Sequence, residues 1–492
     1  MNQTVPGIKS RIEQVQSEAL IRANSYRSSR FITIVAFLSG LGLMINVRIG
    51  VRLSLTELFA PFLFVAMAAG LNRLLANPVV RNLIFFVGLN LVGIVVSDML
   101  GDVPFADSMR GIAKPVFILL LFINFGLLFI QGLQFIIPIY FGFILGALLH
   151  LFFNTGDDQF DFTLASMDYA FFVFRVSALV SLTAGLAGFF LLKIHRSLML
   201  IAISLGMGVS VVFSGRSAVV VWLSATIALY FATRSSSVDW VSVLYPRRKM
   251  VSFVISSIAL GILSYFAYAE LATSGFLPES SKQKLNREQL ENEIGFGPIG
   301  LLMAGRAEVV GSILMIYDSP IIGHGTSSMC GEYFLRAYRL AGQKKISERE
   351  IVGMVQGRVV TGHSILFHSW ASHGILVLPL WIYVLMSLFR SLTIMVMVKS
   401  LYAPLFVLQI IGVFWDVFFS PLSVNTRAWI PLLLAFFAFY IPHVQQHASF
   451  QLAQLNKLRL PTPLKRNVAQ PRARRLGQVP VDDSESKVQL PS

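Results

Sequence analysis

Hydrophobic residues gather along this chain in runs of about twenty, and short polar intervals separate the runs. A helix of about twenty residues crosses the ~30 Å hydrocarbon core of a bilayer, so each run predicts one membrane span. The first run extends from Phe31 to Val47. The others lie near 56–71, 82–97, 112–130, 134–152, 171–192, 197–213, 217–233, 251–268, 364–389, 402–419 and 428–443. The pattern predicts an all-α, polytopic integral membrane protein with about twelve transmembrane helices.

One long polar interval, at residues 269–363, interrupts this pattern. We expect a large loop there, with amphipathic helices at Arg306–Tyr317 and 331–358 along the membrane surface. The loop leaves nine spans within 31–268 and three within 364–443. Residues 1–30 form a polar, basic N-terminal segment. The tail at 444–492 carries several prolines and an arginine cluster, which predicts a disordered, basic segment.

Composition and charge support the membrane assignment and set its orientation. Hydrophobic residues make up 55% of the 492 residues and charged residues only 13%, with a mean hydropathy of +0.70. The net charge of +15 does not indicate nucleic-acid binding, because the basic residues cluster at the chain ends. Of the 40 Lys and Arg, 23 fall in intervals on the side of the termini and seven in short intervals on the other side. The positive-inside rule therefore predicts cytoplasmic termini and a loop that faces outward.

Cysteine and histidine spacing gives no indication of a metal site. The single cysteine, Cys330, excludes an internal disulfide and zinc sites built from Cys-x-x-Cys pairs. His363, His368 and His373 lie five residues apart, so on one helix each is rotated by about 140° from the previous one. They do not share a face, which argues against a three-histidine site. We expect neither a metal nor a cofactor.

Arg216 lies in the sequence Phe213-Ser-Gly-Arg-Ser217, between two apolar runs with almost no loop. An arginine so close to the hydrocarbon core is costly unless it has a partner or a function. The Gly and Ser residues allow a tight turn with free N–H groups, so this segment is a candidate phosphate site at the outer leaflet. The alternative is an arginine that extends to the lipid headgroups.

Two further candidates stand at the borders of the loop. Arg306 opens an apolar helix, where its charge opposes the helix dipole; a nearby anion explains it, as does a local pair with Glu308. His363 lies where the loop meets the next apolar run, and its ordinary pKa suits a general base for a sugar hydroxyl. A structural histidine at the membrane surface is the alternative.

Acidic residues give weaker indications. Asp98 and Asp102 end the third span on the outer side, and Asp107 follows. Paired acids there could act as a base or hold a divalent ion, but without a cluster of partner ligands we expect them to be solvated loop residues. Acids within the spans are scarce, with Glu57 and Asp416 as the main candidates, which argues against a proton-coupled carrier.

Four motifs, in this order, resemble the bacterial O-antigen ligase and O-antigen polymerase superfamily. They are Ser214-Gly-Arg216, Gly305-Arg306, the Pro-x-x-Gly-x-Gly of Pro320–Gly325, and His363-x-x-Leu366 with Gly374 eleven residues after the histidine. The span pattern extends the resemblance over most of residues 31–443. Ser364 departs from the family, which often has Asn there.

The resemblance implies a C-type glycosyltransferase-like fold with a large periplasmic loop in the bacterial inner membrane. It implies a metal-independent, inverting transfer of an undecaprenyl-diphosphate-linked glycan to an acceptor such as lipid A–core. Arg216 and Arg306 would hold the diphosphate, with Arg175 and Arg427 in support, and His363 would be the base. A polymerase of O-antigen or exopolysaccharide repeats is a close alternative, and a flippase of lipid-linked sugars is a more distant one.

Overall fold

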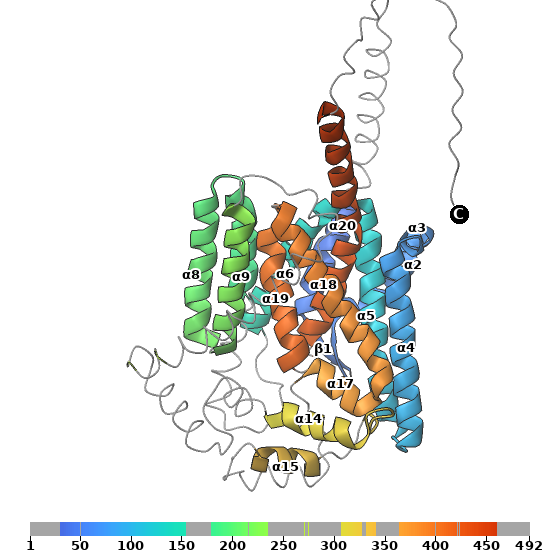
Figure 1. Ribbon diagram of the computed structural model, residues 1–492. Coiled ribbons are helices and arrows are strands. Elements are labelled where there is room, and N and C mark those ends of the chain that lie inside the picture. The colour runs from blue at the N-terminus through green and yellow to red at the C-terminus, as the bar shows by residue number, and fades with distance from the viewer. Residues whose placement is uncertain are drawn as a thin grey trace, which may run out of the picture.

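The computed structural model describes residues 30–49, 51–153, 179–214, 216–234, 270, 274, 307–326, 331–340, 364–398, 400–420, 422 and 424–459. Within these ranges the chain is mostly helical, which confirms the predicted helical membrane class in its coarse form (Figure 1). The predicted span near 251–268 lies outside the described residues.

Long helices correspond closely to the apolar runs. The helices of the first half are Arg30–Met44, α2 (Leu55–Met67), α3 (Leu71–Leu75), α4 (Pro78–Leu100), α5 (Phe105–Gln131), α6 (Ile136–Phe153), Leu179–Leu192, α8 (Arg196–Ser214) and α9 (Arg216–Arg234). Those of the second half are α14 (Ala307–Asp318), α15 (Gly331–Leu340), α17 (Ile365–His373), α18 (Leu378–Val398), α19 (Ala403–Phe419) and α20 (Val424–Arg459).

Five helical segments of the described chain are long and apolar enough to cross a membrane. They are Leu55–Leu75, Pro78–Leu100, Phe105–Gln131, Ile375–Val398 and Thr426–Phe450. Seven further apolar helical stretches of 10–17 residues occur in the described part of the chain. The chain is therefore compatible with a multi-pass membrane protein, and the number of about twelve spans stays a prediction.

A small β-hairpin is the one departure from an all-α fold in the described part of the chain. The first apolar helix ends at Met44, and β1 (Asn46–Ile49) pairs antiparallel with β2 (Val51–Ser54). Apolar residues alternate with polar ones from Asn46 to Ser54, a period of two that indicates a strand. The predicted first span at 31–47 is thus too long at its end.

The predicted span at 364–389 is divided in two. Gly374 adopts a left-handed φ of 73° at the end of α17, a conformation that ends helices and favours glycine. A 3₁₀ turn at Ile375–Val377 then leads into α18, so the candidate span begins at Ile375. The helix α17 precedes that span instead of belonging to it.

One end of the helix bundle gathers the non-spanning elements. Figure 1 shows the β-hairpin, α14, α15 and α17 at the lower end of the bundle, while the last turns of α20 extend beyond the upper end. Helices α2, α5 and α20 begin at the lower end, and α4 ends there. Helix α20 continues to Arg459, although the sequence analysis placed a disordered tail from residue 444.

Packing of α20 against α5 forms the centre of the bundle. Aromatic side chains from α6, α19 and α20 fill it: Tyr140, Phe143, Phe406, Trp429 and Phe436 are in ring contact with one another in pairs. Such pairs stabilise a core beyond the area that they bury. The rigid centre fixes the first turns of α5 and α20 relative to each other.

Candidate functional site

The predicted site residues differ in how far the structure describes them. His363, Arg306 and Arg175 lie outside the described residues. Arg216 is the first residue of α9, one residue after the end of α8 at Ser214. This confirms two apolar helices joined by a minimal connection at Ser-Gly-Arg. Arg427 is fully described, and the site is built from it.

Arg427 lies in the first turn of α20, buried, with its Nε atom 3.4 Å from Oε1 of Glu57. Glu57 is itself held in a capping box: it accepts from the Ser54 N–H at 2.7 Å, and its own N–H donates to Ser54 Oγ. The carboxylate is 1% exposed, and it both caps the start of α2 and neutralises a cation of α20. Glu57 has a structural role, and it leaves Arg427 at a fixed position.

Asp416, the second acid within the apolar runs, also contacts the first turn of α20. Thr426 Oγ1 donates to Asp416 Oδ2 at 3.0 Å, which joins α20 to the end of α19. Both acids that the sequence singled out therefore position the start of α20.

Lys114 adds a second cation at this end of the bundle. It lies in the third turn of α5, close enough to Arg427 for their charges to interact. Its side chain keeps accessible surface, although Gly111 and Pro115 beside it are buried. No carboxylate of the described residues forms an ion pair with Lys114.

His368 and His373 of α17 face the same region. Burial, together with the charge of Lys114, lowers the pKa of His368 to about 4. Burial also lowers the pKa of His373 to about 3, while Asp98 acts in the opposite direction. The buried Nδ1 of His368 has no hydrogen-bond partner among the described residues. Both rings are therefore neutral at pH 7, close to Lys114.

Asp98 is not the solvated loop residue that the sequence analysis expected. It is 4% exposed in the last turn of α4. Its Oδ1 accepts from the N–H of Thr326 at 2.7 Å and its Oδ2 from Thr326 Oγ1 at 2.8 Å. The prediction is wrong because a segment 228 residues away covers the carboxylate. Asp102 is exposed, and Asp107 pairs with the exposed Arg110, as expected.

The Pro-x-x-Gly-x-Gly motif forms the turn that carries Thr326. Gly323 and Gly325 have φ values of 80° and 85°. The turn lies against the end of α17, where His324 and Gly325 donate their N–H groups to the carbonyls of Ala371 and Ser372 at 3.0 and 2.7 Å. A Cβ on Gly323 would come within 2.5 Å of the Ser372 carbonyl oxygen. Close backbone packing explains the glycine here.

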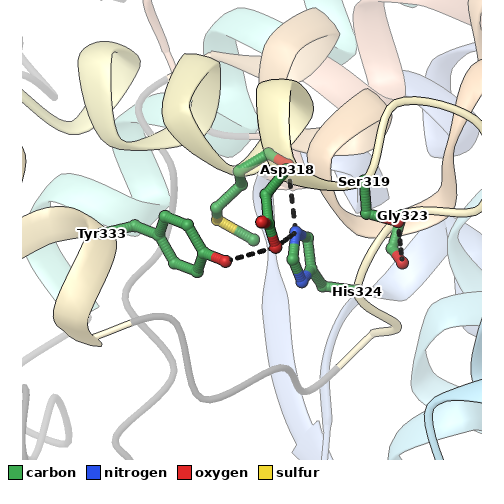
Figure 2. Close-up of polar contacts among 6 residues, drawn as sticks. Asp318, Ser319, Gly323, His324 and Tyr333 are labelled. Atoms are coloured by element: carbon green, nitrogen blue, oxygen red, sulfur yellow. Dashed lines mark hydrogen bonds and ion pairs between the residues drawn. The ribbon is translucent and has the colours of Figure 1, made fainter.

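Polar contacts also tie this turn to α14 and α15. Figure 2 shows His324 beneath the end of α14, with Nε2 at 3.0 Å from the carbonyl oxygen of Met315. Tyr333 of α15 donates to Asp318 at 2.6 Å, and Ser319 donates to the Gly323 carbonyl at 3.1 Å. The end of α14, the turn and α15 therefore form one connected unit.

The sequence analysis missed Lys114, took Asp98 for a solvated loop residue, and weighed His368 only as a metal ligand. The available signal was position: each stands within one or two turns of a span end on the predicted outer side. In the described part of the chain, no three His, Cys, Asp or Glu side chains gather closely enough to ligate a metal ion. No protein-family model matches this chain, and no curated protein matches it either.

Proposed function

We propose that this chain is an inner-membrane glycosyltransferase of surface-polysaccharide assembly. It transfers a glycan from undecaprenyl diphosphate to a sugar hydroxyl of an acceptor, as an O-antigen ligase does with lipid A–core. The observation that carries the proposal is the pair of neighbouring cations at one end of the bundle, Lys114 and Arg427, of which only Arg427 has a described carboxylate partner, Glu57. A cation without a carboxylate partner in the described part of the chain can bind a lipid-linked diphosphate.

In the proposed reaction the cations act on the leaving group. Arg216, Arg306 and Arg427, with Arg175 and Lys114 in support, hold the diphosphate and stabilise the charge that develops on it as the bond from the anomeric carbon to the phosphate oxygen breaks. The acceptor hydroxyl attacks the same carbon from the opposite face, which inverts its configuration. His363 accepts the hydroxyl proton. No metal or cofactor enters this mechanism.

The position of His363 fits this role by chain connectivity. It directly precedes Ser364, whose buried side chain caps α17 by accepting from the Phe367 N–H and itself donates to the Val417 carbonyl. In the same helix, His368 lies near Lys114. The base and the cations are thus attached to elements that contact one another.

The proposed placement follows from the charge distribution. The protein crosses the bacterial inner membrane about twelve times, both termini are cytoplasmic, and the loop at 269–363 is periplasmic. The periplasmic side is where polymerised, lipid-linked glycans are transferred.

A polymerase of O-antigen or exopolysaccharide repeats uses the same donor and differs only in its acceptor. A flippase of lipid-linked sugars is the more distant alternative. It would need polar groups along a path through the membrane. The described polar contacts of Asp98, Thr326, His373, Glu57 and Arg427 all lie at one end of the bundle, which favours a one-sided enzyme.

The deciding experiment is a transfer assay with purified protein, undecaprenyl-diphosphate oligosaccharide and EDTA, with and without lipid A–core. Glycan on lipid A–core establishes a metal-independent ligase. Longer lipid-linked chains without that acceptor establish a polymerase. With a matched native donor, the absence of both products would contradict the proposal and favour transport.

A further inference from the structure

We infer that Asp98 is a positioning residue of the transferase: through Thr326 it clamps the glycine turn of the large loop to α4, and it thereby sets the loop-borne groups against the cations of the bundle. This inference rests on the proposed function for its catalytic part. The clamp itself rests on contacts of described residues.

The clamp is a two-point contact. Each carboxylate oxygen of Asp98 accepts one hydrogen bond from Thr326, from the main-chain N–H at 2.7 Å and from Oγ1 at 2.8 Å. Two short hydrogen bonds to a buried carboxylate hold the donor residue much more firmly than one hydrogen bond between neutral groups does. Two contacts also fix orientation, because rotation about one would break the other.

A second contact stands directly beside the clamp. Ser97 Oγ lies 3.2 Å from Nδ1 of His373, the last residue of α17. Two glycines show how closely the elements approach: a Cβ on Gly101 would lie 3.3 Å from the His324 carbonyl oxygen, and one on Gly111 would overlap the Thr326 side chain. The final turn of α4 therefore meets both the turn and α17.

The turn connects this point to the two helices that adjoin Arg306 and His363, α14 and α17. The turn is bonded to the end of α14 through His324 and Met315, and α14 begins at Ala307, the residue after Arg306. It is also bonded to the end of α17 at Ala371 and Ser372, and α17 follows His363 after the single capping residue. Movement of the turn would displace both segments together.

The other half of the proposed site does not depend on the clamp. Lys114 and Arg427 belong to α5 and α20, whose packing forms the centre of the bundle. Loss of the clamp would leave these cations in place while the loop shifts against them. Reaction rates fall steeply when reacting groups move by about 1 Å, and affinity for a donor held by the bundle cations changes less.

A cysteine introduced by Ser372→Cys reports on the clamp, in a background where Cys330, the single cysteine, is replaced by Cys330→Ser. Ser372 is 3% exposed and its carbonyl accepts from the N–H of Gly325, so the turn lies against it. The rate at which a membrane-impermeant maleimide labels position 372 therefore reports how firmly the turn is held. The disrupting variants are Asp98→Leu, which removes both hydrogen bonds, and Thr326→Val, which removes the one from Oγ1; Asp98→Asn and Thr326→Ser retain paired hydrogen bonds. Asp107→Leu is the control, since Asp107 pairs only with the exposed Arg110 among the described residues.

We expect labelling to accelerate about fivefold or more in Asp98→Leu and Thr326→Val, with the double variant no faster than Asp98→Leu alone. Transfer at saturating donor should fall about tenfold or more, with donor KM changed less than about threefold. Asp98→Asn, Thr326→Ser and Asp107→Leu should stay within about twofold of wild type in both measurements. If Asp98→Leu does not fold, the same two measurements on Thr326→Val still test the clamp.

Each outcome decides one part. Unchanged labelling in both disrupting variants would overturn the clamp, whatever the activity. Faster labelling with an unchanged transfer rate would overturn the positioning role. If the wild-type protein transfers no glycan, the proposed function fails, and the labelling result still decides whether the clamp exists.

Discussion

Arg427 and Glu57 join the first turns of α20 and α2, with 3.4 Å between Nε and Oε1. The carboxylate is 1% exposed and also caps its own helix. Residues that begin two separate helices thus neutralise each other at the end of the bundle where the loop elements gather. The pair fixes the position of Arg427, which we propose binds the donor's diphosphate.

Removing one member of this pair should be costly. Arg427→Met leaves Glu57 buried without its partner and should lower the free energy of unfolding by about 3 kcal/mol. Adding Glu57→Gln, which preserves the capping geometry, should restore most of that loss. Unfolding in mixed micelles with increasing SDS measures both variants. Arg390→Met, which loses an exposed contact with Gln445, is the control. Equal stability of the single and double variants would contradict an energetic coupling of the pair.

Gly374, where the turn packs against the end of α17, should tolerate no side chain. Gly374→Ala places a Cβ on the Ile321 carbonyl in a backbone conformation that L-residues rarely adopt, and we expect a loss of about 1–3 kcal/mol or more. Gly88→Ala is the matched control: a Cβ there meets nothing within 4 Å, and alanine favours the helix by about 0.5–1 kcal/mol. Melting temperatures in detergent should therefore shift in opposite directions. A stable Gly374→Ala variant would show that the turn does not pack against α17 in this way.

Acid should weaken the fold through His373. The folded protein holds its pKa at about 3, below its value in the unfolded chain, so the unfolded chain binds the extra proton as pH falls below about 6.5. Stability is fully present above that pH and declines between about 6.5 and 3. His373→Gln keeps a polar group beside Ser97 and does not titrate, so its melting temperature should fall less steeply from pH 7.5 to 4.5. Identical slopes would refute the contribution of His373.

Lys114 should matter for transfer and Lys193 should not. Lys114→Met removes an accessible cation from the proposed site and should lower transfer about tenfold or more, since a charge-assisted hydrogen bond contributes about 1.5–3 kcal/mol. Lys193 lies over the Phe189 ring, outside this group of residues, at the connection to α8. Lys193→Met should transfer normally. Equal activities of the two variants would remove Lys114 from the proposed site.

His363→Ala should abolish glycan transfer while membrane insertion and abundance stay normal, because the acceptor hydroxyl loses its base. Immunoblots of membrane fractions and the transfer assay measure the two properties separately. His443→Ala is the control, because His443 lies in α20 at the end of the predicted span that faces the cytoplasm. Full activity of His363→Ala would refute the assignment of the base.

Apolar length was sufficient to predict most helices. The runs at 82–97 and 402–419 correspond to α4 and α19 within a few residues, because a helix in lipid must satisfy its own backbone groups. The run at 364–389 misled, since hydrophobicity continues through Gly374 while the backbone turns there. Only the packing of residues 321–325 against that glycine explains the break.

The sequence indicates candidate residues where charge meets an apolar run, as at Arg427, and the role of Arg427 stays a prediction. Asp98 was not predictable in this way, because its environment depends on Thr326, which is far away in the sequence. A carboxylate at the end of a span has the same local sequence whether water or a returning loop covers it. Long-range contacts of this kind leave no local pattern.

The length of α20 has a mechanical consequence. Its candidate span ends at Phe450, and the helix continues through residues 451–459. At about 1.5 Å per residue, these nine residues form a stalk of about 14 Å. The C-terminal segment that follows therefore starts at a set distance beyond the span, and any protein that grips that segment would pull along the axis of the helix that carries Arg427.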